Sequence, residues 1–193
     1  VERMHELLGQ QPVIHDGPGD DIPAGTPLEL AFRQVNFSYT EDKPLLQDIS
    51  FIVRPGTTLG LLGRTGSGKT TLARLIFRLY DATGGAISLS GTDIRLATLS
   101  QLRQRVAYVT QDVQLFQASV RDNITFFNSR ISDERILRVI ETLELADWFN
   151  SLPNGLDTRL ATGGRSLSAG EAQLLAFTRV FLRDPGLVIL DEA

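Results

Sequence analysis

The sequence predicts an α/β fold, and three observations support this class. Short stretches rich in β-branched and apolar residues alternate with stretches whose apolar residues recur at helical spacing. The segments Leu59–Leu62 and Leu187–Leu190 are nearly all apolar, as expected for parallel strands covered on both faces. A glycine-rich loop joins the first of them to a helical stretch. We therefore expect a mostly parallel core sheet with an antiparallel β portion near the front of the chain.

The expected elements begin at residue 28 and alternate along the chain. Alternating or continuous apolar patterns predict strands over Leu28–Tyr39, Ile49–Arg54, Thr57–Leu62, Ala86–Leu89, Val106–Thr110 and Leu187–Asp191. Helical periodicity predicts helices over Lys69–Tyr80, Leu99–Arg105, Asp133–Leu145 and Ser168–Arg183.

Composition narrows the possible functions. The chain has 193 residues, of which 42% are apolar and 22% charged, so it can bury a core and is not a disordered segment. It contains no cysteine, which excludes disulfides and thiolate metal sites. The net charge of −4 argues against a nucleic-acid partner. The longest run without a charged residue, Ala82–Thr92, is much shorter than the roughly 18 residues of a membrane span.

The first 27 residues differ from the rest. Val1–Gly9 places Met4, Leu7 and Leu8 at helical spacing before a glycine, which predicts the last turns of a helix. Gln10–Pro27 is interrupted by prolines and glycines and is expected to be a linker. We therefore divide the chain into two parts. Residues 1–27 are a helix end and a linker that lead from an upstream part, and residues 28–193 are a domain. A frayed helix of the same domain is the alternative.

The strongest motif is a glycine-rich loop that fits the pattern G-x-x-x-x-G-K-[ST]. It consists of Gly63, Arg64, Thr65, Gly66, Ser67, Gly68, Lys69 and Thr70. The glycines allow successive N–H groups to turn inward at a helix start, where they bind phosphate. Lys69 can reach the β- and γ-phosphates, the Thr70 hydroxyl can bind Mg²⁺, and Thr71 is a further phosphate donor. An ordinary glycine-rich turn is disfavoured because the loop lies between a predicted strand and a predicted helix.

Two carboxylates follow the last apolar strand. Asp191 can hold Mg²⁺ at the sheet edge, and Glu192 can orient or deprotonate the attacking water. A solvated turn is the competing interpretation, which the phosphate loop makes less plausible.

A second candidate anion site lies at Leu167–Glu171. Ser168 and Glu171 form a predicted capping box, which by itself explains both residues. Gly170 is not explained by capping, and a glycine-bearing helix start is a second site of the phosphate-binding kind.

Taken in order, these motifs resemble the nucleotide-binding domain of ATP-binding cassette (ABC) transporters of the exporter type, over Leu28–Ala193. The resemblance implies a P-loop NTPase fold with an antiparallel β subdomain and a helical signature subdomain. Its implied cofactors are ATP and Mg²⁺, and its implied reaction is ATP hydrolysis coupled to transport. Leu167–Glu171 stands where the family has its signature sequence.

The resemblance also implies roles for individual residues. Tyr39 is similar to the aromatic residue that stacks on adenine, and Gln111 to the glutamine that contacts Mg²⁺ and the water. The catalytic set is then Glu192, Gln111 and Lys69, and the metal set is Thr70, Gln111 and Asp191. Ser168 and Gly170 would contact the ATP that an opposite subunit holds.

The implied partners are a transmembrane domain upstream and a second nucleotide-binding domain arranged head to tail, at the cytoplasmic face of the cell membrane. The family's final elements, including its switch histidine, would follow Ala193, so we expect the fragment alone to hydrolyse ATP slowly. Ala169 and Glu171 depart from the family's signature. This departure suggests a heterodimer with unequal ATP sites, and a homodimer stays equally open.

Two other functions remain. One is a soluble ABC-type ATPase without a membrane domain, and the other is a nucleotide sensor that does not hydrolyse ATP. The substrate of a transporter of this kind is chosen by the membrane domain, so this sequence does not identify it.

Overall fold

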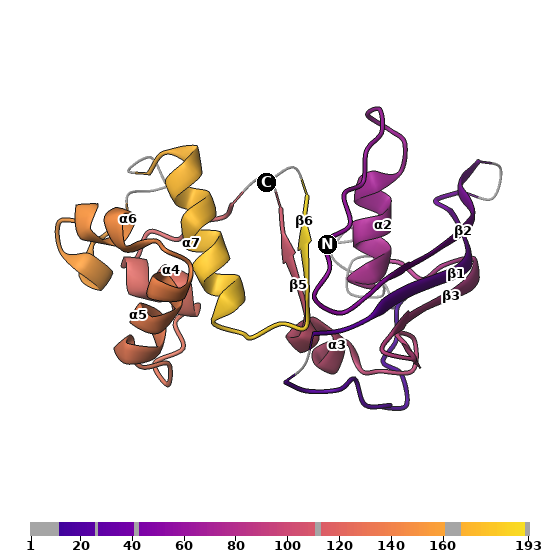
Figure 1. The fold of residues 1–193 in the computed structure, drawn as a ribbon, viewed down its shortest axis with the longest axis horizontal. Coiled ribbons are helices and arrows are strands. Elements are labelled where there is room, and N and C mark those ends of the chain that lie inside the picture. Colours follow the sequence, from indigo (N-terminus) through magenta and orange to yellow (C-terminus); the bar gives the residue numbers. More distant parts are fainter. Residues whose placement is uncertain (1–11, 26, 41–42, 111–112, 161–166, 192–193) are drawn as a thin grey trace, which may run out of the picture. The chain divides into compact units, whose positions relative to one another are not determined.

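The structure is a computed structural model that describes residues 12–25, 27–40, 43–110, 113–160 and 167–191 (Figure 1). The chain divides into two compact units, Val1–Arg103 and Gln104–Ala193, and each unit is described by itself. The predicted helix end at Val1–Gly9, Gln111 and Glu192 lie outside the described residues.

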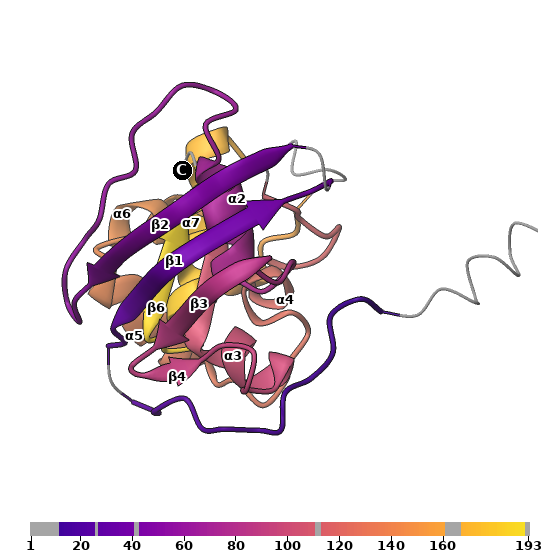
Figure 2. The same cartoon turned by 90° about the vertical axis from the view of Figure 1, so that its right-hand side faces the viewer.

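The first unit is built on an antiparallel sheet of four strands in the order β2-β1-β3-β4 (Figure 2). The strands are β1 (Leu30–Ser38), β2 (Pro44–Val53), β3 (Gly84–Leu89) and β4 (Thr92–Asp93). Leu30 pairs with Val53 on one side and with Leu89 on the other. This sheet confirms the expected antiparallel β portion.

Helix α2 (Lys69–Ile76) lies along one face of this sheet (Figures 1 and 2). Its residues Ala73, Leu75 and Ile76 are buried, together with Phe32 and Leu89 of the strands. Helix α3 (Leu99–Arg105) adds the fully buried Leu102. Burial of these apolar side chains is the main stabilising contribution to the unit.

The expected strand over Thr57–Leu62 is wrong in the described structure. No strand is present there, and Leu62 is 98% exposed. A strand needs a neighbour that completes its backbone hydrogen bonds. Among the described residues, neither sheet pairs with this segment. The glycine-rich loop is therefore preceded by irregular chain rather than by a paired strand.

The segment over residues 12–25 has no helix or strand, but part of it is held firmly against the first unit. The N–H groups of Gly19 and Asp20 donate to the Leu96 carbonyl at 2.9 and 3.0 Å, and that of Gly17 donates to Ala97 at 3.2 Å. The Leu99 N–H donates to Asp16 Oδ1 at 2.6 Å. Residues 15–21 therefore form a strap over the turn that follows β4.

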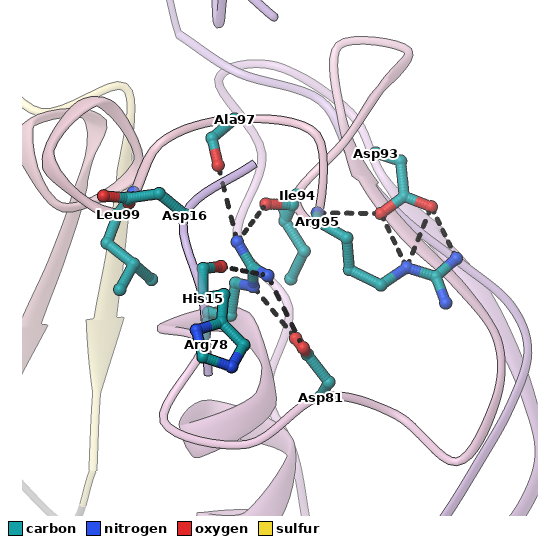
Figure 3. A network of polar contacts seen from close by, with 9 residues as sticks. All are labelled: His15, Asp16, Arg78, Asp81, Asp93, Ile94, Arg95, Ala97 and Leu99. Carbon is teal, nitrogen blue, oxygen red and sulfur yellow. Dashed lines mark hydrogen bonds and ion pairs between the residues drawn. The ribbon is translucent and has the colours of Figure 1, made fainter. Parts of the chain in front are cut away.

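Arg78 fastens this strap from inside (Figure 3). Its side chain is 5% exposed and pairs with Asp81, with 2.9 Å between Nε and Oδ1. Nη2 donates to the His15 carbonyl at 2.9 Å, and Nη1 approaches the carbonyls of Ile94 and Ala97, both at 3.4 Å. A buried guanidinium is stable only when its donors are satisfied, and here the strap supplies one of the acceptors.

The second unit contains a parallel strand pair and a group of helices. The pair is β5 (Val106–Val109) and β6 (Leu187–Leu190). The helical elements are α4 (Val120–Thr125), α5 (Asp133–Thr142), α6 (Ala146–Ser151), the 3₁₀ turn η1 (Gly155–Asp157) and α7 (Ala169–Phe181). The short elements α4, α6 and η1 were not predicted from the sequence.

Helix α7 lies between the strand pair and the other helices of this unit (Figure 1), and it belongs to two hydrophobic clusters. Leu175 packs with residues of α4, α5 and α6, including Ile124, Ile136 and Trp148. Ala176 and Val180 pack against β5 and β6. Helix α7 thus covers one face of the strand pair. The residues of β6 are half-buried or exposed, so the expected coverage of this strand on both faces is wrong among the described residues.

Helix α3 has the predicted bounds, whereas α2, α5 and α7 end earlier than their sequence periodicity suggested. Arg78, Glu144 and Asp184 follow the helices α2, α5 and α7, and each has a positive φ near 50°. A left-handed residue turns the chain away from the helix axis. None of the described helices is both long enough and apolar enough to cross a lipid bilayer.

Candidate nucleotide-binding site

The glycine-rich loop leads directly into α2, as the sequence predicted. Gly68 is the N-cap of the helix and makes no side-chain capping bond. Lys69 Nζ donates to the carbonyls of Gly63 at 2.7 Å and Arg64 at 3.1 Å, and the Ser67 N–H donates to Arg64 at 3.1 Å. The lysine ammonium is therefore held against the loop itself, where a phosphate group would be received.

At two positions of the loop, an added side chain would crowd a neighbouring side chain. Gly68 has φ +92°, and a Cβ there would lie 2.7 Å from Cδ2 of the buried Leu46. A Cβ at Gly63 would lie 2.5 Å from Ser67 Oγ. A backbone can approach an anion closely only where no side chain intervenes. The loop thus fits a polyphosphate ligand, with the N–H groups at the start of α2 as donors.

Tyr39 stands beside the same helix. Its hydroxyl lies 3.2 Å from Thr71 Oγ1, and Arg74 Nη1 donates to it at 3.3 Å. The rings of Phe37 and Tyr80 contact the Tyr39 ring edge to face, with ring centroids 4.8 and 5.1 Å away. The ring is 46% exposed, so it can offer a surface for stacking. The Thr71 hydroxyl, which we expect to bind phosphate, thus also contacts Tyr39.

The predicted capping box at the start of α7 is confirmed. Ser168 Oγ accepts from the Glu171 N–H at 3.2 Å, and the Ser168 N–H donates to Glu171 Oε2 at 2.7 Å. The Ser168 N–H that donates to the carboxylate, and after it the Ser168 hydroxyl beside the carboxylate, hold the pKa of Glu171 below its usual value of 4.5. Ala169 is the first residue of the helix and is not left-handed, so its methyl group causes no backbone strain.

Gly170 is not explained by packing against the described residues. A Cβ added to it would meet none of their atoms within 4 Å. Neither a turn nor a close neighbour therefore requires glycine at this exposed position, which is consistent with the close approach of another molecule.

Asp191 directly follows β6 in the second unit. Its N–H donates to the Val109 carbonyl at 3.0 Å, and its Oδ2 accepts from the Tyr108 hydroxyl at 2.8 Å. A carboxylate oxygen is a ligand that Mg²⁺ prefers, and a threonine hydroxyl such as that of Thr70 on α2 is another. The described residues therefore include two of the three expected metal ligands, Thr70 and Asp191.

Sequence reasoning missed a buried polar network around Arg179. Arg179 Nε donates to the carbonyl of Asn123 at 2.6 Å, Nη2 donates to its Oδ1 at 3.2 Å, and Nη1 donates to the Gln114 carbonyl at 2.9 Å. Burial lowers the pKa of Arg179 to about 10, so the guanidinium remains charged at neutral pH. The fully buried Asn123 in turn binds both backbone groups of Phe116. The network fixes the chain that follows β5.

Three exposed aromatic residues gather above this network. We call Phe116, Phe126 and Phe127 the aromatic cluster; Phe116 contacts the other two with ring centroids 6.0 and 5.4 Å apart. Each is between 44% and 56% exposed. The Arg179 guanidinium lies 4.8 Å from the Phe126 ring centroid. A grouped set of exposed aromatic side chains marks an interaction surface more often than scattered ones do.

Comparison with known proteins identifies the family. The ABC transporter family model matches residues 46–193. The ABC transporter ATP-binding protein YknV of Bacillus subtilis is 38% identical over the whole chain, which spans 32% of that protein. The multidrug efflux ATP-binding/permease protein Rv0194 of Mycobacterium tuberculosis is 37% identical over 98% of the chain, which spans 16% of it.

A solved structure agrees with these relatives. The structure of a bacterial Atm1-family ABC exporter with ATP bound superposes with a TM-score of 0.88 and 32% identity, covering 99% of this chain and 33% of the exporter chain. The chain thus spans a third or less of the length of these relatives. The family match, these identities and the shared α/β fold lead to one conclusion: the chain belongs to the ABC transporter family.

Proposed function

We propose that this chain is the ATP-binding and ATP-hydrolysing part of an ABC exporter, in which it powers the transport of a substrate across a membrane. The observation that carries the proposal is the loop ahead of α2, where Gly63 and Gly68 leave no room for a side chain and Lys69 is held against the loop. Two relatives add support, since one is an efflux permease and the other an exporter with ATP bound.

The proposed chemistry assigns each residue a limited task. Lys69 and the N–H groups of the loop hold the β- and γ-phosphates, and Tyr39 stacks on the adenine ring. Thr70, Gln111 and Asp191 provide oxygen ligands for Mg²⁺, which when bound neutralises charge on the phosphates. Glu192 holds the attacking water and accepts its proton.

We further propose that the chain works with a transmembrane domain at the cytoplasmic face of the membrane and with a second ATP-binding domain. The aromatic cluster supports the first partner, because it offers grouped exposed apolar area. Gly170 supports the second, because no described residue lies close enough to require glycine at this exposed position. Ser168 and Gly170 would then contact ATP held by the opposite subunit.

The test of hydrolysis compares phosphate release by the full-length protein with that of Glu192→Gln and Lys69→Ala. We expect Glu192→Gln to bind ATP but to release phosphate about 10²- to 10⁴-fold more slowly. Lys69→Ala should lose most ATP binding. Glu141→Gln, an exposed substitution on α5, is the matched control and should behave as wild type. Equally slow release by wild type and Glu192→Gln would instead favour a nucleotide sensor.

The test of the membrane partner uses Phe127→Ser. We expect this variant to bind ATP normally but to lose the stimulation of phosphate release by transported substrate or by reconstitution into vesicles. Leu137→Ser, which also removes an exposed apolar side chain but on α5, is the control. A full-length protein that fractionates without membranes would favour the soluble ABC-type ATPase.

A further inference from the structure

We infer that Tyr108 is a positioning residue for Asp191 and, through it, for the divalent cation of the nucleotide site. The inference rests on the proposed function, since it takes Asp191 to be a metal ligand. Its starting point is the hydrogen bond from the Tyr108 hydroxyl to Asp191 Oδ2 at 2.8 Å, which joins β5 to the residue after β6.

Strand geometry explains why these two side chains meet. The parallel register pairs Tyr108 with Ile189, and residues two apart on a strand point to the same face. Asp191 is two residues beyond Ile189, so it lies on the face of the strand pair that Tyr108 occupies. Its N–H also donates to the Val109 carbonyl, which continues the ladder past the end of β6. Both the backbone and the carboxylate of Asp191 are thus held by β5.

This face is opposite the one that α7 covers. Ala107 and Val109, the neighbours of Tyr108 on β5, pack with Ala176 and Val180 of α7, and Val188 of β6 packs there too. Tyr108 therefore contributes little to that hydrophobic cluster. A Tyr108→Phe substitution would remove only the hydroxyl, which donates the hydrogen bond to Asp191.

The chemistry of the bond suits a metal ligand. Rotation of a carboxylate about its last torsion is broad, so an aspartate at a strand end does not by itself fix the direction of its oxygens. A hydroxyl that donates to one oxygen fixes this rotation and hence the direction of the other oxygen. A phenol does so without adding a positive charge, which would compete with the cation. Partners of this kind typically change metal affinity by about 10- to 100-fold.

The experiment measures binding of Mn²⁺, as a probe for the cation, to the full-length protein at saturating ATP, with free Mn²⁺ followed by electron paramagnetic resonance. We expect Tyr108→Phe to weaken Mn²⁺ binding by about 10-fold or more. ATP binding in the presence of EDTA should not change. The control is Thr142→Val, which removes a hydroxyl donating to a carbonyl at 2.8 Å on α5, and it should bind Mn²⁺ as wild type does.

Asp191→Asn separates the inference from the proposed function. If Asp191→Asn leaves Mn²⁺ affinity unchanged, the metal role of Asp191 is wrong. If Asp191→Asn weakens binding and Tyr108→Phe does not, the positioning role of Tyr108 is wrong. In the Asp191→Asn background, Tyr108→Phe should cause no further loss, whereas an equal additional loss would show that Tyr108 acts elsewhere.

Incomplete folding is controlled within the same measurement. Bound Mn²⁺ is expressed per bound ATP, so that unfolded molecules do not contribute, and thermal unfolding of each variant is recorded. A loss of Mn²⁺ binding that disappears after this normalisation would overturn the inference.

Discussion

The guanidinium of Arg78 donates a hydrogen bond to the main-chain carbonyl of His15 at 2.9 Å, across 63 residues of sequence (Figure 3). Arg78 comes two residues after the end of α2, the helix that begins at the phosphate loop. The strap and the segment that follows α2 are therefore joined through one buried side chain.

Arg78→Met should release the strap. The substitution keeps an apolar stem of similar length but leaves Asp81 and the His15 carbonyl without their buried donor, and breaking a buried ion pair costs about 3–5 kcal/mol. Because Asp81 is partly exposed, we expect the free energy of unfolding to fall by an amount at the lower end of this range. Hydrogen exchange at the amides of Gly17, Gly19 and Asp20 should accelerate markedly, and the unfolding temperature should fall.

The control is Arg95→Met. Arg95 forms an ion pair with Asp93 at 2.6 Å, but its side chain is 41% exposed. Exposed pairs contribute about 0.2–1 kcal/mol, so exchange in the strap should change little. Equal acceleration in both variants would contradict the anchoring role of Arg78.

Gly68→Ala and Gly66→Ala test the shape of the phosphate loop. Both glycines have positive φ, at +92° and +83°, so each alanine should cost about 1–2 kcal/mol of backbone strain. Only Gly68→Ala would also bring the new methyl group against Leu46, and this overpacking should cost about 1–3 kcal/mol more. Gly68→Ala should therefore unfold at the lower temperature. Unfolding temperatures that are equal, or reversed in order, would show that contact with Leu46 is not decisive.

The carboxyl group of Glu171 should titrate below pH 4.5 in a carbon-detected NMR experiment. The folded-state pKa is lowered, so the stabilisation from the capping box is present above the unfolded-state pKa and is lost as the pH falls through the folded-state value. Ser168→Ala removes the hydroxyl but keeps the backbone donor, so the pKa should rise part of the way to its usual value. No movement of the midpoint in Ser168→Ala would contradict the side-chain contribution.

Arg179→Lys should destabilise the second unit. A lysine ammonium cannot reach all the acceptors that the planar guanidinium binds, and the Asn123 and Gln114 carbonyls would lose charged donors worth about 1.5–3 kcal/mol each. We expect a lower midpoint in urea unfolding. Arg138→Lys is the control, because Arg138 is exposed and bonds only a carbonyl of its own helix at 3.3 Å. A similar midpoint for both variants would rule out a special role for the buried network.

Local sequence signals located the starts of the important helices. The glycine-lysine pair marked the start of α2, and the Ser168–Glu171 spacing marked that of α7, because both depend on residues close in sequence. Helices α4 and α6 have six residues each, too few for periodicity to show. In β2, Asp48 has φ +50° and interrupts the alternation, so only its second half was predicted.

Interactions between distant residues could not be predicted in this way. The bond between Tyr108 and Asp191 depends on the register of two strands whose partners are about 80 residues apart, and the expected strand over residues 57–62 needed a pairing partner that periodicity does not reveal. No local pattern marks Arg179 within the predicted helix, since its acceptors Asn123 and Gln114 lie 56 and 65 residues away.

The packing of α7 has a mechanical consequence. The helix has 13 residues and is about 20 Å long. It packs against apolar clusters on two sides, so rotation about its axis would disturb both. Ser168 lies at one end and Arg179, which touches the Phe126 ring, near the other. Ser168 and the contact between Arg179 and Phe126 are therefore held at a fixed separation by one rigid helix.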